Sequence, residues 1–162
     1  MAEEPLAKAP RELVDGVEMR PAAEQEIDDL LPLMRAYCDF YESSPADAGL
    51  IEMARALIND PAQGAIFIAR ENGVAVGFAT VDWKWSSLRG ARIGYLEDLF
   101  VAPEARGRGI ADALIQACAG RCRELGMPAM EWLTAPDNER AQNVYDRTGA
   151  TSETFVEYDL EL

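Results

Sequence analysis

The sequence contains no histidine and only three cysteines among its 162 residues, so most side chains that bind transition metals are missing. A zinc site would have to combine Cys118 and Cys122 with carboxylates. These two cysteines lie one helical turn apart, a spacing that suits a disulfide poorly, and Cys38 makes their number odd. We therefore predict three reduced thiols used in packing, and no bound metal.

Long apolar runs are also missing. No stretch of about 18 apolar residues occurs, and residues 1–16 have neither the basic start nor the apolar centre of a secretory signal. We therefore predict a cytoplasmic protein. Residues 1–16 are rich in Glu, Ala and Pro without periodicity, which predicts a flexible N-terminal extension before a single domain over 17–162.

Basic residues are scarce. The chain has 15 Lys and Arg against 29 Asp and Glu, a formal net charge of −14. Nucleic acid demands a basic face, so this class of partner is excluded. The charge suits a cationic substrate, although an acidic surface that only keeps the protein in solution explains it equally well.

Hydrophobic periodicity predicts alternating strands and helices. We expect strands over 17–20, 65–70, 74–82, 92–101, 129–134 and 155–160, and helices over about 28–43, 47–59, 107–125 and 138–147. Asn72 and Gly73 mark a tight hairpin. Residues 83–91 are expected to form a connection in which Trp83 and Trp85 either line a pocket or pack against the sheet.

The order of these elements predicts the fold class. A strand, a crossover helix and the next strand form a right-handed unit with parallel strands, whereas the earlier strands form an antiparallel meander. We therefore predict an α/β (α+β) fold with a mixed sheet, antiparallel to parallel at its centre, and helices on both faces.

One stretch carries the clearest functional signal. The strand that ends at Val101 leads through a Pro- and Gly-marked turn into an apolar-periodic helix. Gly107 and Gly109 have no Cβ, so the backbone can turn sharply and a ligand can approach the amides. The free N–H groups of the first helical turn, with Arg106 and Arg108 beside them, predict a phosphate or pyrophosphate site.

Two common phosphate motifs do not fit this turn. A Walker loop requires Gly-Lys-Ser or Gly-Lys-Thr, whereas Ile110 and Ala111 follow Gly109. A dinucleotide fingerprint would place its third glycine at Asp112 and would lie in an early βαβ unit. The sequence therefore matches neither the Walker loop nor the dinucleotide fingerprint.

Four segments, in this order and spacing, resemble the GNAT superfamily of N-acetyltransferases: Tyr95-Leu-Glu-Asp-Leu-Phe-Val101, Pro103-Glu-Ala-Arg-Gly-Arg-Gly-Ile-Ala111, Asn138-Glu-Arg-Ala141 and Tyr145-Asp-Arg-Thr-Gly149. The resemblance covers about residues 17–162 and is closest in motif to the diamine (spermidine/spermine) acetyltransferases. The superfamily has Gln or Arg where this chain has Glu104, which leaves Arg106 and Arg108 as the basic partners of a phosphate.

The resemblance implies transfer of acetyl from acetyl-CoA to a primary amine by direct attack. It implies that the backbone of Leu99, Phe100 and Val101 pairs with the pantetheine arm, and that Asn138, Ala141 and Tyr145 also contact the cofactor. The pyrophosphate would be held by Arg106, Gly107, Arg108, Gly109, Ile110, Ala111 and Asp112. By analogy with the polyamine group, a homodimer is expected.

The chemistry requires a proton acceptor and a proton donor. A primary amine with a pKa of about 10.4 is protonated at neutral pH, and its neutral form costs roughly 4 kcal/mol. Glu97 matches the family carboxylate and is predicted to take the proton directly, to pass it to water, or only to attract the cation. In a regular strand the Asp98 side chain points to the face opposite Glu97, whereas a bulge can turn both side chains to one face. Tyr145 is predicted to protonate the departing thiolate, unless it only packs on the sheet.

The acceptor is predicted to be a small, cationic, polyamine-like amine. Besides Glu97, the candidate substrate-binding acids are Glu131 and Glu157 on the last two expected strands, and Asp82 is a weaker candidate. Three alternatives stay open: a protein or peptide amine, an aminoglycoside-like amine, and a non-catalytic acyl-CoA-binding sensor.

Overall fold

The computed structural model describes residues 11–162. Six strands form one sheet in the order β1-β2-β3-β4-β5-β6, with only β5 and β6 parallel. The strands are β1 Arg11–Val14, β2 Val17–Pro21, β3 Gly64–Glu71, β4 Val74–Ser86, β5 Ala91–Val101 and β6 Met130–Glu131. The helices are α1 Ile27–Phe40, α2 Asp47–Asn59, α3 Ile110–Glu124 and α4 Glu139–Asp146, with short 3₁₀ turns at Glu24–Glu26 and Pro103–Ala105.

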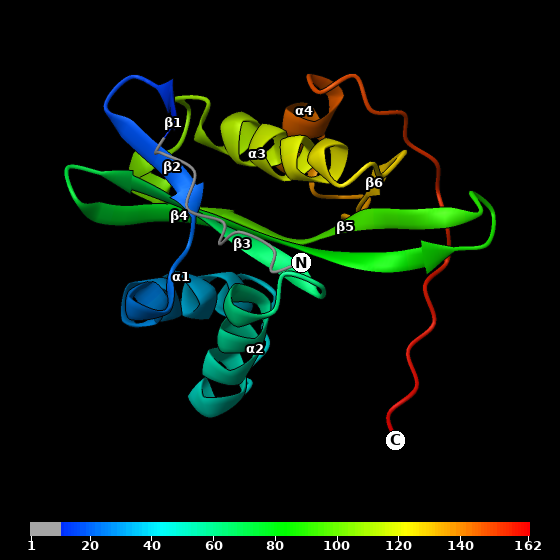
Figure 1. Cartoon of the computed structure of the whole chain (residues 1–162), viewed down its shortest axis with the longest axis horizontal. Coiled ribbons are helices and arrows are strands. Elements are labelled where there is room, and N and C mark those ends of the chain that lie inside the picture. Colours follow the sequence, from blue (N-terminus) through cyan, green and yellow to red (C-terminus); the bar gives the residue numbers. More distant parts are fainter. Residues whose placement is uncertain (1–10) are drawn as a thin grey trace, which may run out of the picture.

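Helices cover both faces of the sheet. Helices α1 and α2 lie on one face, and α3 and α4 lie on the other (Figure 1). Each face has its own buried core: Leu30, Ile68 and Phe78 lie under α1 and α2, whereas Leu114 and Ile115 belong to the core of the α3 face. The predicted mixed sheet with helices on both faces is therefore confirmed.

Most local predictions are confirmed, with one shift at a helix start. Asn72 and Gly73 turn between β3 and β4 with φ of 50° and 80°, as a tight hairpin requires. The helix expected from residue 107 begins only at Ile110, because Gly107 and Gly109 adopt φ of 76° and 83°, outside helical geometry. No helix in the described part of the chain is long and apolar enough to cross a membrane.

The structure describes only the last part of the predicted N-terminal extension over 1–16. Residues 1–10 lie outside the described residues. Arg11–Val14 pairs antiparallel with β2, so this part of the expected extension is a strand instead. A short edge strand therefore precedes, and pairs with, the first strand that the sequence predicts.

The expected loop over 83–91 is wrong for its first half. Strands β4 and β5 continue to pair from Trp83 opposite Gly94 to Ser86 opposite Ala91, so Trp83 and Trp85 are strand residues. The Trp83 side chain is buried and its indole N–H donates to the Pro61 carbonyl at 2.9 Å, which makes it a packing residue. Trp85 is 77% exposed.

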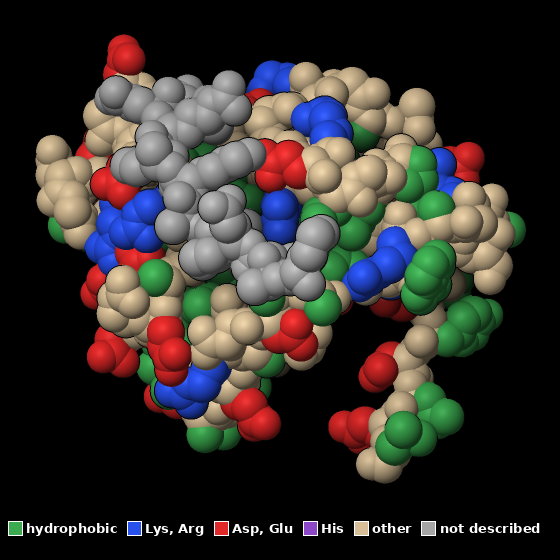
Figure 2. Space-filling model, in the orientation of Figure 1, with side chains coloured by type: hydrophobic (Ala, Val, Ile, Leu, Met, Phe, Trp, Pro, Cys, Tyr) green, Lys and Arg blue, Asp and Glu red, His purple; other side chains and the backbone are tan. Residues whose placement is uncertain are grey.

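The expected strands at the C-terminal end are shortened or absent. The strand predicted over 129–134 is reduced to Met130–Glu131, and no strand forms over 155–160. After α4 the chain instead runs past β5 and ends away from the sheet (Figure 1), with apolar and acidic side chains standing free (Figure 2). The alternation of Val156, Tyr158 and Leu160 gives this segment an apolar face, but the segment pairs with no strand of the described chain.

The three cysteines are free thiols. Cys118 and Cys122 are buried on the inner side of α3, and Cys38 is half-buried on α1. The prediction of reduced, packed thiols is confirmed. Cys122 also bears on the junction of β5 and β6, because Gly94 packs directly against it and donates its N–H to the Ala129 carbonyl at 3.0 Å.

We predict that Gly94→Ala destabilises the fold. A Cβ at this position would lie 2.3 Å from Cys122 Sγ, so the helix or the strand must move. Overpacking of this kind lowers the free energy of unfolding by about 1–3 kcal/mol, measurable by urea denaturation. Adding Cys122→Ala should recover part of the loss. As the control, Gly49→Ala meets no atom within 4 Å and should not destabilise; an unchanged Gly94→Ala variant would contradict the prediction.

Candidate active site

Glu97 lies in a β-bulge of β5. Thr80 of β4 faces Asp98 and the next residue, Val81, faces Leu96, so Glu97 has no partner across the ladder. The bulge resets the alternation of side chains: Leu96 and Leu99 both contact the core of the α3 face, and the two acids between them lie on the face of α1 and α2. The regular strand that would separate Glu97 from Asp98 is therefore not present.

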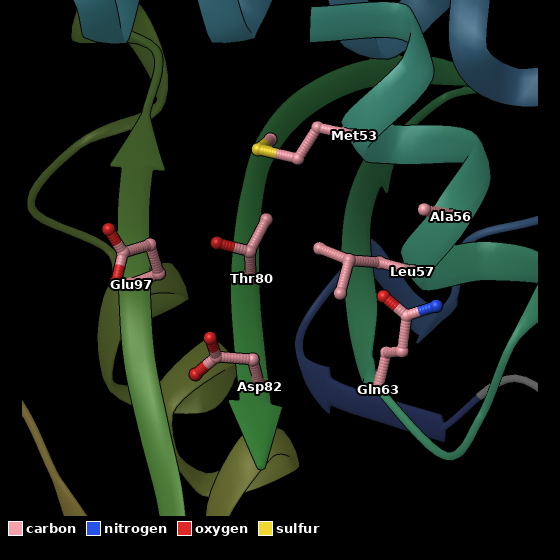
Figure 3. Close-up of a pocket in the computed structure, with 7 residues that line it drawn as sticks. All are labelled: Met53, Ala56, Leu57, Gln63, Thr80, Asp82 and Glu97. Atoms are coloured by element: carbon pink, nitrogen blue, oxygen red, sulfur yellow. The ribbon is translucent and has the colours of Figure 1, made fainter. Parts of the chain in front are cut away.

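A cavity of about 450 Å³ opens beside this bulge, between α2 and the central strands. Its wall on α2 is apolar, and its wall on β4 and β5 is polar (Figure 3). In Figure 3 the side chains of Thr80 and Asp82 extend from β4 toward Glu97 on β5. The lining residues are Met53, Ala56, Leu57, Gln63, Thr80, Asp82 and Glu97. The volume lies in the range of small-molecule sites.

The acids of this cavity have raised pKa values. Burial raises the pKa of Glu97, and the nearby charges of Asp98, Asp82 and Glu157 raise it further, against an opposing effect of Lys84. Burial also raises the pKa of Asp82, whose Oδ1 is buried without a hydrogen-bond partner in the described chain. Such a site attracts a cation and moves its carboxylates closer to the pKa that suits proton transfer near neutral pH.

Asp98 lies behind this cavity in a hydrogen-bonded network. The Thr80 hydroxyl donates to Asp98 Oδ2, and the Asp98 N–H donates back to Thr80 Oγ1 at 3.1 Å. The Tyr37 hydroxyl of α1 donates to the Glu97 carbonyl at 3.3 Å. These bonds join α1, β4 and β5 at the bulge. Sequence reasoning did not identify Thr80 or Tyr37, because a single polar residue in a strand or helix carries no local signal.

On its other edge, β5 is open. Strand β6 pairs only with Gly94 and Tyr95, so within the described residues no strand lies beside 96–101 on that edge. This open stretch includes Leu99, Phe100 and Val101. Arg106 Nε donates to the Val101 carbonyl at 2.7 Å. An extended ligand can add to this edge by backbone hydrogen bonds, as an added strand would.

The glycine turn follows directly from this edge. Gly109 precedes α3 without a side-chain cap, so the amides of Ile110, Ala111 and Asp112 in the first helical turn have no partner four residues earlier within the helix. This confirms the helix N-terminus that the sequence predicts. With the dipole of α3, these amides form an anion-binding arrangement.

The charged side chains around the turn are already engaged. Arg108 forms an ion pair with Glu71 at the end of β3, and Arg106 lies over the Phe100 ring at 5.6 Å. Asp112 accepts hydrogen bonds from Arg147 at 2.9 and 3.1 Å, which lowers the pKa of Asp112. Among the described residues Arg106 forms no ion pair and can meet a phosphate directly, whereas Arg108 must first leave Glu71.

Helix α4 carries the other predicted cofactor residues. Asn138 caps this helix, its Oδ1 accepting the Ala141 N–H at 3.2 Å. Tyr145 packs edge-on against Trp132 with ring centroids 5.5 Å apart. Burial raises the pKa of Tyr145 to about 12, and no residue in the described chain hydrogen-bonds to its hydroxyl. The phenol therefore remains protonated, and available as a donor, at neutral pH.

The two secondary acids lie elsewhere. Glu131 forms ion pairs with Arg89 at 3.1 Å and with Lys84 at 3.8 Å, and does not line the cavity. Glu157 is exposed on the C-terminal segment, and its charge is among those that raise the pKa of Glu97. The structure thus gathers Glu97 with Asp82 and Asp98. The described residues contain no group of three or more potential metal ligands.

Comparison with known proteins identifies the family. The acetyltransferase (GNAT) family matches residues 30–150, so the chain belongs to this family of acetyl-CoA-dependent N-acetyltransferases. An uncharacterized N-acetyltransferase of Bacillus subtilis, YhfO, is 30% identical over 89% of this chain and 97% of its own length. An aminoglycoside N(6′)-acetyltransferase type 1 of Salmonella typhimurium is 35% identical over 52% of this chain and 61% of its own length.

Solved structures agree with the fold. A probable acetyltransferase superposes with a TM-score of 0.77 and 28% identity, over 89% of this chain and 97% of the other. The aminoglycoside acetyltransferase AAC(6′)-Iy, in complex with the bisubstrate analogue CoA-S-monomethyl-acetylneamine, gives a TM-score of 0.78 and 25% identity over 90% and 99% of the two chains. Structures of this fold therefore include one that holds a coenzyme A derivative.

The engaged arginine at the glycine turn yields a prediction. Because Glu71 holds Arg108, the ion pair competes with phosphate, and Glu71→Gln should tighten coenzyme A binding about two- to fivefold at low salt in isothermal titration calorimetry. The control is Glu24→Gln, which removes the same charge from an ion pair with Arg55 on α2. This pair is not part of the glycine turn. Equal tightening by both variants would mean that only net charge matters.

Proposed function

We propose that this protein transfers acetyl from acetyl-CoA to a primary amine of a small cationic acceptor by direct attack. The bulge at Glu97 carries the proposal. It turns two adjacent acids toward a cavity on one side of β5, while the other edge of the same stretch is open for an extended cofactor arm. Acceptor and acyl donor can then meet at one strand from opposite sides.

The proposed cofactor site combines the open edge, the glycine turn and α4. The amides from Gly107 to Asp112 hold the pyrophosphate, and Arg106 and Arg108 complete its neutralisation. The backbone of Leu99, Phe100 and Val101 pairs with the pantetheine arm, with Asn138, Ala141 and Tyr145 on its other side. This arrangement is supported by the free amides of α3 and by the unpaired edge of β5.

The proposed reaction needs no covalent enzyme intermediate. The amine lone pair attacks the thioester carbonyl carbon, the C–S bond breaks, and the thiolate takes the Tyr145 proton. The phenol hydroxyl has no hydrogen-bond partner among the described residues, which supports this donor role. The ammonium form of the acceptor must first lose a proton, and Glu97 and Asp82 are the acids that meet it in the cavity.

The cavity supports a polyamine-like acceptor. Its acids suit an ammonium group, and the apolar wall of Met53, Ala56 and Leu57 suits a chain of methylene groups. An aminoglycoside-like amine is the second candidate, because relatives include an aminoglycoside N(6′)-acetyltransferase. Thialysine and L-ornithine acetyltransferases are also among the relatives, so an amino acid with a side-chain amine is a further acceptor to test. A coenzyme A-binding sensor without turnover is the third candidate.

Turnover on a panel of amines tests this proposal. Purified protein and acetyl-CoA are incubated with spermidine, 1,4-diaminobutane, an aminoglycoside, L-ornithine, thialysine and a lysine peptide, and released thiol is measured. We expect the highest kcat/KM for a small diamine or polyamine. If thiol is released only with the aminoglycoside or only with the peptide, that amine replaces the polyamine as the proposed acceptor. If no amine releases thiol, the coenzyme A-binding sensor is the remaining candidate.

Two matched variants test the role of the cavity acids. Glu97→Gln removes a carboxylate that lines the cavity, and should raise the KM for the amine about tenfold or more. Glu131→Gln removes the same charge from an acid that is held by Arg89 and Lys84, and should change this KM much less. If both variants raise KM equally, the charge of the whole surface, and not the cavity, attracts the acceptor.

We also propose a cytoplasmic homodimer, consistent with three free thiols and with an unpartnered C-terminal segment. The segment exposes five large apolar side chains, which favours its burial against a second copy: Phe155, Val156, Tyr158, Leu160 and Leu162.

Deleting 155–162 should convert a dimer to a monomer in light scattering, whereas replacing Glu157 and Asp159 by their amides should not. A monomeric wild type, or a truncated protein that stays dimeric, would rule out this role of the segment.

A further inference from the structure

Asp98 is a half-buried acid that the proposed reaction does not yet use. It does not line the cavity, yet it binds Thr80, which does. The contact is double: the Thr80 hydroxyl donates to Asp98 Oδ2 and accepts the Asp98 N–H at 3.1 Å. The bulge makes this possible, since a regular β5 would send Asp98 to the other face.

The double contact fixes the orientation of the Thr80 hydroxyl. A hydroxyl has one hydrogen to donate and two lone pairs. Its hydrogen is bound to Asp98 Oδ2, and one lone pair is taken by the Asp98 N–H. The second lone pair has no partner in the described chain. Thr80 lines the cavity and its side chain extends toward Glu97 (Figure 3), so an N–H of a bound acceptor can use this lone pair.

We propose that Thr80 and Asp98 form a proton relay in which the acceptor ammonium donates to Thr80 Oγ1 and the Thr80 hydroxyl proton passes to Asp98 Oδ2. The N–H bond of the ammonium breaks, an O–H bond forms on Thr80, the original Thr80 O–H bond breaks, and an O–H bond forms on Asp98. The amine is left neutral with its lone pair free, and Asp98 is left neutral. This inference rests on the proposed amine acetylation.

The surroundings of Asp98 suit a proton acceptor. Burial raises its pKa above that of an ordinary aspartate and the charge of Asp82 adds to this, while the hydrogen bond from Thr80 lowers it. Tyr37 and Cys38 face it from α1, Asp82 from β4 and Glu97 from β5. The part of α2 at the cavity is apolar, with Met53, Ala56 and Leu57. The relay gives Glu97 the separate role of holding the cation.

The relay also explains why a second acid behind the cavity is useful here. A carboxylate in contact with the acceptor holds the ammonium form by charge attraction, which opposes its deprotonation. An acid one hydroxyl away accepts the proton without forming the tightest ion pair with the amine. Glu97 and Asp98, adjacent in sequence and turned to the same face, thus divide binding from proton acceptance.

Steady-state kinetics over pH 6–10 tests the relay, with acetyl-CoA and the best amine of the panel. Thr80→Val and Asp98→Asn should each lower kcat about 100-fold at pH 7 with little change in the amine KM. The deficit should shrink about tenfold per pH unit toward pH 10, because the amine then loses its proton to water. The double variant should be no worse than either single one, since both remove one relay.

Two further variants separate the relay from a structural role. Thr80→Ser keeps the hydroxyl and should retain kcat within a few-fold, even if Thr80→Val folds poorly. Asp28→Asn, which changes an exposed carboxylate on α1 outside the cavity, should leave kcat and its pH dependence unchanged. Deficits that are constant with pH, or a Thr80→Val variant as active as wild type, would overturn the relay alone. A wild type that acetylates no amine would overturn the proposed function and the relay together.

Discussion

The bulge at Glu97 is the feature on which the functional part of the structure depends. One extra residue in β5 turns two neighbouring acids to the same face and keeps Leu96 and Leu99 in the core of the other face. Without the bulge, side chains would alternate along β5, and Glu97 and Asp98 would lie on opposite faces of the sheet. The bonds between Thr80 and Asp98, and from Tyr37 to the Glu97 carbonyl, hold the irregular backbone in place. Structural support and chemistry therefore use the same groups.

The early end of β6 is the second constraint. Because pairing stops after Tyr95, the following six residues of β5 have a covered edge toward β4 and an open edge on the other side. The open edge continues into the glycine turn and the N-terminus of α3. In the proposed cofactor site, the backbone groups of this edge and turn bind the pantetheine arm and the pyrophosphate, so Glu104 need not contact a phosphate.

Local signals in the sequence were sufficient for much of this fold. The helix Asp47–Asn59, the turn at Asn72 and Gly73, and the glycine turn before α3 each follow from a few neighbouring residues. The bulge could not be predicted, because β5 reads as an uninterrupted strand and its register exists only relative to β4. The same holds for residues 155–160. Their alternation of apolar and polar side chains fits a strand, but a strand forms only where another strand pairs with it. Thr80 became part of the site only once the two strands were aligned.

The charge of the protein acts on its two ligands in opposite directions. A net charge of −14 attracts a cationic amine and repels coenzyme A, which carries several phosphate charges. At physiological salt these effects act over only about 8 Å, so the local groups decide. On the cavity side the local groups are acids with Lys84 as the opposing charge. At the turn they are amides, a helix N-terminus and arginines whose charges are offset by Glu71 and Asp112. In the proposed arrangement each ligand therefore meets local groups that suit its charge: acids for the amine, and amides with arginines for coenzyme A.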